Sequence, residues 1–176
     1  MTAPHRDLCT DCGISRSADP KRCGRACQFI APRHAQLEAR VHGRARDMGS
    51  DERWFGPFAE MRRARLVPAR EGAQWTGITT RIAERLLETG AVEAVLTMAP
   101  DPADSWKPMP VIITAAEGMS RARGMRMGYA PLLALLEPVR DRGYKRIAVI
   151  GIPCQVYALR AIEQDLGLDR LYVIGT

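Results

Sequence analysis

The last third of the chain constrains the fold most. Residues 147–152 read IAVIGI, a continuous apolar run typical of a strand buried on both faces of a parallel sheet. A short turn leads into QVYALRAIEQDLG at 155–167, which predicts a helix, and LYVIG at 171–175 predicts another strand. Strand, helix and strand in this order predict a β-α-β unit with a right-handed crossover. The expected fold class is therefore α/β, with a partly parallel sheet and helices.

The sequence before this unit continues the alternation of helices and strands. The helix predicted at 75–90 places Ile78, Ile82 and Leu86 on one face. Further predictions are strands at 91–98 and 110–115, a short helix at 115–124, and a longer helix at 129–143 that Pro138 kinks or ends. Residues 71–176 are thus predicted to form an α/β domain. Because the chain ends with a strand and not with the loop after it, where open α/β sheets carry their sites, we expect this domain to be truncated.

The first 70 residues have a different texture. Residues 1–34 hold four of the five cysteines and show no clear hydrophobic periodicity. This small loop-rich segment cannot build its own core, so it needs a bound metal or another cross-link to be stable. Residues 35–70 are predicted to form a basic helical linker, with helices at 35–47 and 58–67. Of the net charge of +6, residues 1–70 carry all, since 13 arginines and Lys21 face 8 acids. A basic surface formed by these residues would attract nucleic acid, anionic lipid or an acidic protein. The alternative is that these charges only face solvent.

Composition excludes several classes. The chain has 176 residues, and its 46% hydrophobic content is too high for a disordered chain. No window of 18 apolar residues predicts a membrane span, and the N-terminus has no apolar core of a secretory signal. We expect a cytoplasmic protein, in which thiols stay reduced and clustered cysteines bind metal. The basic residues lack interleaved aromatics, so no nucleic-acid partner is expected.

The cysteines form the strongest local signal. Their spacing is Cys9-x2-Cys12-x10-Cys23-x3-Cys27, two close pairs that can bring four thiolates to one centre. Thiolates suit both zinc and iron–sulfur clusters, and spacing alone does not choose between them. His5 and His34 flank the segment and can replace a thiolate. Cys154 lies alone at a strand-to-helix turn, either as a small buried side chain or as a ligand or redox thiol at a helix N-terminus.

Two segments are candidates for binding an anionic cofactor. Residues 71–80 place glycines, an amide and hydroxyls before a helix whose free N–H groups can hold a phosphate. Residues 120–129 carry three arginines between glycines; the alternatives are a glycine-rich helix start for the first segment and a solvated charge run for the second. The segment VHGRARD at 41–47 has the same ambiguity. The candidate cofactor-binding residues are Gly72, Gln74, Trp75, Thr76, Gly77, Arg123 and Arg126.

Several of these sequence motifs, taken together, resemble those of a known family. LCTDCG…ACQF, VHGRARD, EGAQWTGI, KPMPVI and VIGIPCQVYALRAIE…LGLDRLYVIGT occur in order over nearly the whole chain. They resemble the family of coenzyme F420 hydrogenase β-subunits, and more closely its ferredoxin-dependent branch of chlorophyll reductases. Within that branch, EGAQWTG and PMPVI look most like the 8-vinyl reductases.

The resemblance implies an iron–sulfur flavoprotein with [4Fe–4S] clusters and FAD. It implies that reduced ferredoxin supplies electrons and that a chlorophyllide-type tetrapyrrole is reduced at its C8 vinyl group to ethyl in (bacterio)chlorophyll biosynthesis for photosynthesis. Alternatives are another oxidoreductase of the family, acting on hydroxymethyl chlorophyll or a deazaflavin, and a basic zinc module that binds nucleic acid. A homo-oligomer is left open, and the fragment alone is expected to be inactive. Candidates for the proton donor are Asp47, Glu71 and Tyr129.

The resemblance also assigns the cysteines. Cys9, Cys12 and Cys27 fall on the family's N-terminal cysteine positions. The sequence departs from the family at Ser15, where many relatives have a third cysteine, and Cys23 is expected to supply that thiolate. Cys154 matches a cysteine associated with a second cluster, whose other ligands would follow Thr176.

Overall fold

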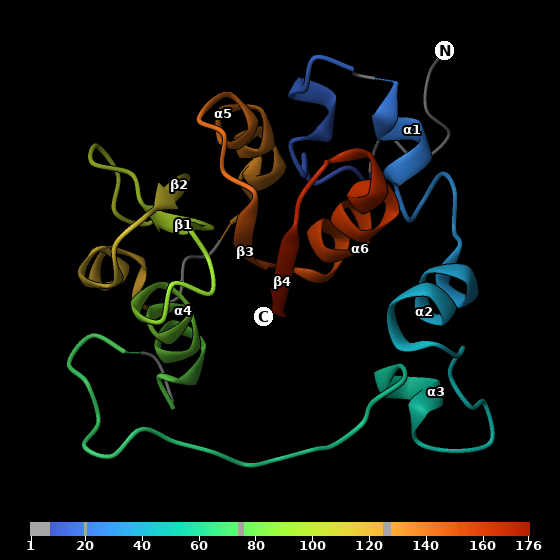
Figure 1. Cartoon of the computed structure of the whole chain (residues 1–176), viewed down its shortest axis with the longest axis horizontal. Coiled ribbons are helices and arrows are strands. Elements are labelled where there is room, and N and C mark those ends of the chain that lie inside the picture. Colours follow the sequence, from blue (N-terminus) through green and yellow to red (C-terminus); the bar gives the residue numbers. More distant parts are fainter. Residues whose placement is uncertain (1–7, 20, 74–75, 125–127) are drawn as a thin grey trace.

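The computed structural model describes residues 8–19, 21–73, 76–124 and 128–176. Its centre is a four-stranded sheet in the order β2-β1-β3-β4 (Figure 1). The pair β1–β2 is antiparallel, whereas β1–β3 and β3–β4 are parallel, so the predicted α/β class with a partly parallel sheet is confirmed. The strands are β1 (Ala94–Pro100), β2 (Pro108–Ile113), β3 (Arg146–Gly151) and β4 (Arg170–Gly175).

The helices lie before and between these strands along the chain. The α-helices are α1 (Arg22–Ala26), α2 (His34–His42), α3 (Glu52–Phe55), α4 (Ile78–Glu88), α5 (Leu136–Asp141) and α6 (Pro153–Ile162). Short 3₁₀ helices are η2 (Ile14–Arg16), η3 (Ala116–Ala122), η4 (Leu132–Leu135) and η5 (Glu163–Asp165). The predicted unit of strand, helix and strand at the C-terminal end is β3-α6-β4, with β3 buried along most of its length.

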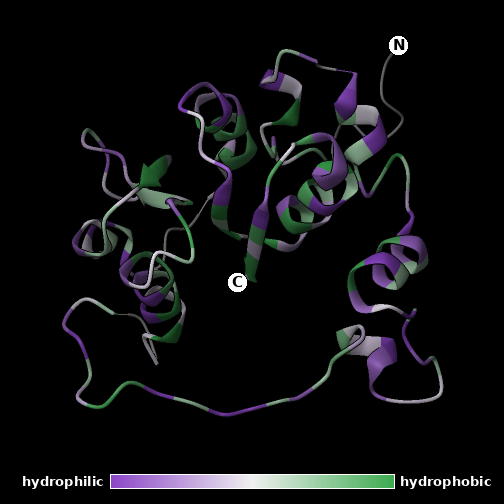
Figure 2. Ribbon diagram, in the orientation of Figure 1, coloured by the Kyte–Doolittle hydropathy of each residue, from purple (hydrophilic) through white to green (hydrophobic). Residues whose placement is uncertain are grey.

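Alternating strand residues divide the core between the two faces of the sheet. Leu96 and Val149 contribute to the cluster formed with α5, α6 and η4. Val95 and Ala148 contribute to the opposite cluster, formed with α4 and η3. Such alternation is what a pleated strand buried on both faces produces. Figure 2 shows the apolar colouring concentrated on the strands and on the helix faces that cover them.

The cysteine segment belongs to the first of these clusters. Ile14 of η2 and Ala26 of α1 are buried together with sheet residues such as Leu96. The N-terminal segment therefore packs on the same face of the sheet as α5 and α6 (Figure 1). This packing gives the loop-rich segment a hydrophobic anchor that its own residues are too few to build.

Two helix predictions in the first 70 residues are wrong: one helix does not form, and the other is shorter than predicted. Residues 58–67 form no helix. After α3 the chain is extended and mostly exposed over residues 57–70, a segment that we call the strap (Figure 1). Its arginines leave no apolar stripe to bury, and a short helix without tertiary packing is unstable in water. The helix predicted at 35–47 ends at His42, because Gly43 takes a left-handed conformation with φ 75°.

The region around Pro138 also differs from prediction. The sequence predicts one long helix at 129–143, but the chain forms η4 and then α5. Pro138 lies in the first turn of α5, where its missing N–H costs no helical hydrogen bond, so it neither ends nor interrupts the helix. β4 forms the predicted second strand; it is an edge strand and only half-buried.

Candidate functional site

The fold holds the N-terminal cysteines against the first turn of η4. The Cys12 carbonyl accepts a hydrogen bond of 2.9 Å from the backbone N–H of Leu133. Cys12 and Cys23 both pack against the main core cluster. Cys23 lies in α1, and Cys27 follows as its C-cap, with its N–H donating to the Cys23 carbonyl over 3.0 Å. Backbone hydrogen bonds thus fix Cys12, Cys23 and Cys27, whereas Cys9 is exposed.

Gly13 makes this docking sterically feasible. Its φ is +104°, and a Cβ added there would lie 2.4 Å from the backbone nitrogen of Ala134 and 2.7 Å from the Pro131 carbonyl oxygen. Both distances are far below any real Cβ contact, and both partners are backbone atoms that a side-chain rotation cannot move. Glycine directly after the second cysteine therefore lets the segment approach η4 closely.

The structure places Cys154 next to the N-terminal cysteine segment. Cys154 lies in the first turn of α6, and its Sγ is 3.3 Å from the Oγ1 of Thr10, between Cys9 and Cys12 in sequence. Gln155 fixes this turn, since its Oε1 accepts from the Ile152 N–H at 3.1 Å and its Nε2 donates to the Ala130 carbonyl at 2.9 Å. Sequence reasoning assigned Cys154 to a separate second site and did not single out Thr10.

The thiols influence one another electrostatically. Burial, together with the nearby thiols of Cys23, Cys154 and Cys9, raises the pKa of Cys12 to about 11, although a hydrogen bond from the Ile14 N–H acts in the opposite direction. Burial also raises the pKa of Cys23, with further increases from Cys27 and Cys9. These effects link all five cysteines as neighbours. All five are free thiols.

The donor set fits a thiolate-ligated centre in kind. Soft thiolate ligands suit iron–sulfur clusters and zinc, and a bound cation stabilises the thiolate forms that burial and mutual repulsion disfavour. Within the residues that the structure describes, no group of three or more His, Cys, Asp or Glu side chains is arranged so that it could hold a metal ion. The five thiols therefore lie near one another but do not form a coordination site around one common centre.

Histidine ligands have no support from the geometry. The His34 ring packs on Tyr157 with centroids 4.9 Å apart, and His5 lies outside the described residues. Tyr157 also joins the residues after Cys27 to α6. Its hydroxyl accepts from the Arg33 N–H at 2.6 Å and donates to the Ala31 carbonyl at 2.8 Å.

The first predicted cofactor segment leads into α4. Gly77 is the N-cap of α4 with φ 67°, and no side chain of the described residues caps this end of the helix. Gly72 also has a positive φ of 71°, and Thr76 is exposed. Gln74 and Trp75 lie outside the described residues.

The second predicted segment approaches the same helix. Arg123, directly after η3, places its Nη2 3.5 Å from the Oε1 of Glu84 in α4. The structure therefore places the second segment against α4, the helix into which the first segment leads. Arg126 lies outside the described residues. Glu84 was missed by sequence reasoning, although an acid among Arg81, Arg85 and an apolar helix face is a recognisable signal.

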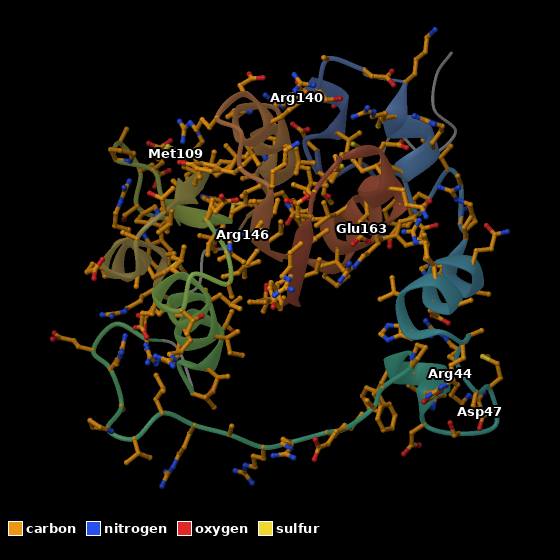
Figure 3. The ribbon with its side chains drawn as sticks, viewed as in Figure 1. Arg44, Asp47, Met109, Arg140, Arg146 and Glu163 are labelled. Carbon is orange, nitrogen blue, oxygen red and sulfur yellow. The ribbon has the colours of Figure 1, made fainter. Side chains whose placement is uncertain are left out.

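The segment VHGRARD does not offer free cations. Arg44 pairs with Glu52, and Arg46 pairs with Glu38. Figure 3 shows Arg44 and Asp47 together at the end of the molecule formed by α2 and α3, away from the cysteine segment. The Asp47 carboxylate accepts from the Gly49 N–H at 2.8 Å, so it holds the local turn. Glu71 and Tyr129, the other candidate proton donors, are both exposed.

Part of the chain matches the model of a known protein family. Residues 61–137 match the family described as coenzyme F420 hydrogenase/dehydrogenase, beta subunit N-terminal domain. The matched segment makes up less than half of the chain. It contains α4, β1, β2, η3 and η4, and so includes both candidate cofactor segments, whereas all five cysteines lie outside it.

Two curated proteins are similar in sequence to nearly the whole chain, and a third to just over half of it. An uncharacterized protein of Nostoc sp. is 40% identical over 98% of the chain and 44% of its own length. The chloroplastic 7-hydroxymethyl chlorophyll a reductase of Oryza sativa is 39% identical over 98% of the chain and 37% of its own length. A component of the F(420)H(2) dehydrogenase of Methanosarcina mazei is 32% identical over 59% of the chain and 29% of its own length.

A solved structure is similar as well. A chain of the F420-reducing [NiFe] hydrogenase complex of Methanosarcina barkeri superposes with a TM-score of 0.55 at 28% identity, over 60% of this chain and 38% of that one. The chain thus spans less than half the length of the relatives and the solved chain that it matches. In the described ranges, no helix is long and apolar enough to cross a membrane.

Proposed function

We propose that this chain is the cofactor-bearing part of an iron–sulfur flavoprotein that reduces a chlorophyllide-type tetrapyrrole with electrons from reduced ferredoxin. The observation that carries the proposal is the convergence of Cys154 on the N-terminal cysteine segment, in a chain whose relatives include a chlorophyll reductase. An electron relay needs a thiolate-rich site held rigidly against the flavin-bearing fold.

Cys9, Cys12, Cys23 and Cys27 are the proposed ligands of a [4Fe–4S] cluster, and Cys154 is a further ligand candidate at the same place. Support comes from the mutual electrostatic influence of these thiols and from the contact between Cys154 and Thr10. In this arrangement the Thr10 hydroxyl can donate a hydrogen bond to the Cys154 sulfur and so stabilise the thiolate form of Cys154.

FAD is the proposed second cofactor. Gly72, Thr76, Gly77 and Arg123 are its candidate contacts among the described residues, and Gln74, Trp75 and Arg126 remain predictions. When bound, a flavin accepts electrons one at a time and passes on two as hydride. The chain's own contribution would be to position that group through the α4 N-terminus and the arginine beside it.

The proposed reaction adds two electrons and two protons to the C8 vinyl group, which becomes ethyl. A second candidate is reduction of a 7-hydroxymethyl group to methyl with release of water, which also takes two electrons and two protons. The 39% identity to a 7-hydroxymethyl chlorophyll a reductase favours this second candidate. Homo-oligomer formation and a cytoplasmic location stay predictions.

Reduced ferredoxin is the proposed electron donor, and the strap is its best-supported docking region. Many arginines of the first 70 residues are already paired with acids, such as Arg44 with Glu52. On the strap, Arg63 and Arg65 are exposed beside Met61, so positive charge and apolar surface lie together. The rate of reduction by ferredoxin should therefore fall as ionic strength rises.

The test has two stages. Anaerobically purified chain should contain iron, acid-labile sulfide and, after incubation, bound FAD; a colourless protein with one zinc ion would contradict the proposal. A protein that contains this chain at the length of its relatives is then given reduced ferredoxin with either divinyl chlorophyllide or 7-hydroxymethyl chlorophyll. Loss of the vinyl absorption signature supports the first reaction, and formation of a methyl product supports the second.

A further inference from the structure

Glu84 is a buried carboxylate surrounded by arginines from three parts of the chain. Its side chain is only 4% exposed. Arg70 at the end of the strap pairs with it, Arg81 of α4 places Nη1 3.2 Å from Oε2, and Arg123 after η3 places Nη2 3.5 Å from Oε1. We call Glu84, Arg70, Arg81 and Arg123 the Glu84 cluster. It joins the strap, α4 and η3 at one point.

Positive charge exceeds negative charge at this point. Three guanidinium groups face one carboxylate, and Glu88 offsets only part of the excess because it also pairs with the more exposed Arg85. Each guanidinium has five N–H donors, so Glu84 cannot accept most of them. The Nε of Arg123 is buried and has no hydrogen-bond partner among the residues that the structure describes. An unpaired buried donor is costly, so an acceptor at this position would be stabilising.

The position of the cluster points to the class of ligand. Arg123 belongs to the second predicted cofactor segment, and Arg70 directly precedes the first. The first segment ends at Gly77, where α4 begins without a side-chain cap. Guanidinium groups bind phosphate oxygens in a bidentate manner, and free N–H groups at a helix N-terminus favour the same ligand.

We infer that the Glu84 cluster binds the diphosphate group of a dinucleotide cofactor, with Glu84 as the positioning residue that gathers the three arginines. The inference rests on the proposed function for the identity of the dinucleotide as FAD. The anion-binding chemistry itself depends only on the residues of the cluster.

The first experiment uses inorganic pyrophosphate as the probe, titrated into the chain by calorimetry at low salt. We expect saturable binding that Arg123→Gln weakens about tenfold, the loss of one charge-assisted contact. Arg85→Gln is the matched control, because Arg85 is 58% exposed and pairs with Glu88 but not with Glu84. Its effect should be less than about twofold on the same scale. Arg70→Gln serves as a second variant if Arg123→Gln unfolds.

The second experiment identifies the source of the diphosphate. FAD and ADP carry a diphosphate, FMN a single phosphate and riboflavin none. We expect Arg123→Gln to weaken FAD and ADP binding by a similar factor and to leave riboflavin binding unchanged. Equal sensitivity of FAD and riboflavin, equal losses in Arg123→Gln and Arg85→Gln, or absence of pyrophosphate binding overturns the inference. Iron and sulfide content is measured on the same samples, so failure of the anion site and failure of the iron–sulfur proposal are separate results.

Discussion

The Sγ of Cys154 lies 3.3 Å from the Oγ1 of Thr10, although 144 positions separate the two residues in the chain. The contact joins the first turn of α6 to the loop between Cys9 and Cys12. It depends on two separate constraints: the packing of Ile14 and Ala26 on the sheet and the fixed turn between β3 and α6. A change in the environment of Cys154 should therefore be felt at the N-terminal cysteines.

Replacement of Thr10 by Val should weaken the iron–sulfur centre. The variant keeps the shape of the side chain but removes the hydroxyl next to Cys154, and loss of such an outer partner typically costs about 10–100-fold in metal affinity. Iron release to a chelator, followed by absorbance, measures the effect. Thr80→Val in the first turn of α4 is the control and should leave release unchanged.

Replacement of Cys154 by Ser should change the EPR spectrum of the centre bound at the N-terminal cysteines. The reason is proximity: the thiol raises the pKa of Cys12 in the free protein, so it lies within electrostatic reach of any centre bound there. An unchanged spectrum with unchanged iron content would mean that Cys154 acts at a site of its own.

Replacement of Gly13 by Ala should destabilise the chain by about 2 kcal/mol or more, because the new Cβ meets backbone atoms of η4 at a positive φ. Urea unfolding measures the loss. Gly24→Ala in α1 is a matched control: a Cβ there meets nothing within 4 Å, and alanine favours the helix. Equal destabilisation by the two variants would contradict the close approach at Gly13.

The central fold was predictable from the sequence because it depends on local apolar runs. IAVIGI and LYVIG flank an amphipathic helix, and burial between helices on both faces of a sheet leaves few other arrangements. The strap was not predictable in the same way. Its residues at 58–67 include good helix formers, but a helix of that length persists only when one face is buried, and nearly all side chains of this segment are exposed.

The site was predictable as residue types but not as an assembly. The paired spacing of the N-terminal cysteines is visible in the sequence, and so are the glycines before α4. The contact of Cys154 with Thr10 and the meeting of Arg123 with Glu84 arise only from tertiary packing, which no local pattern encodes.

Replacement of Tyr157 by Phe should loosen the connection between the cysteine segment and α6. The hydroxyl makes two hydrogen bonds to backbone groups at Ala31 and Arg33, and their loss should cost about 1–2 kcal/mol. Urea unfolding and faster hydrogen exchange of the Arg33 amide are the measurements. Tyr129→Phe is the control, since Tyr129 is exposed and its hydroxyl is solvated.

The loop between α2 and α3 should lose stability in acid through Glu52. Hydrogen bonding from Arg44, and then from the Asp47 N–H, lowers the pKa of Glu52 to about 2. Because the folded-state pKa lies below the unfolded value of about 4.3, the stabilisation is fully present above that value and is lost as pH falls toward 2. Glu52→Gln should therefore lower the urea midpoint at pH 7, and the difference from the parent chain should shrink between pH 4.5 and 2.5. Glu60→Gln, in an exposed pair with Arg62, should show little difference at either pH. A Glu52→Gln difference that stayed constant across this range would show that the carboxylate charge is not the stabilising feature.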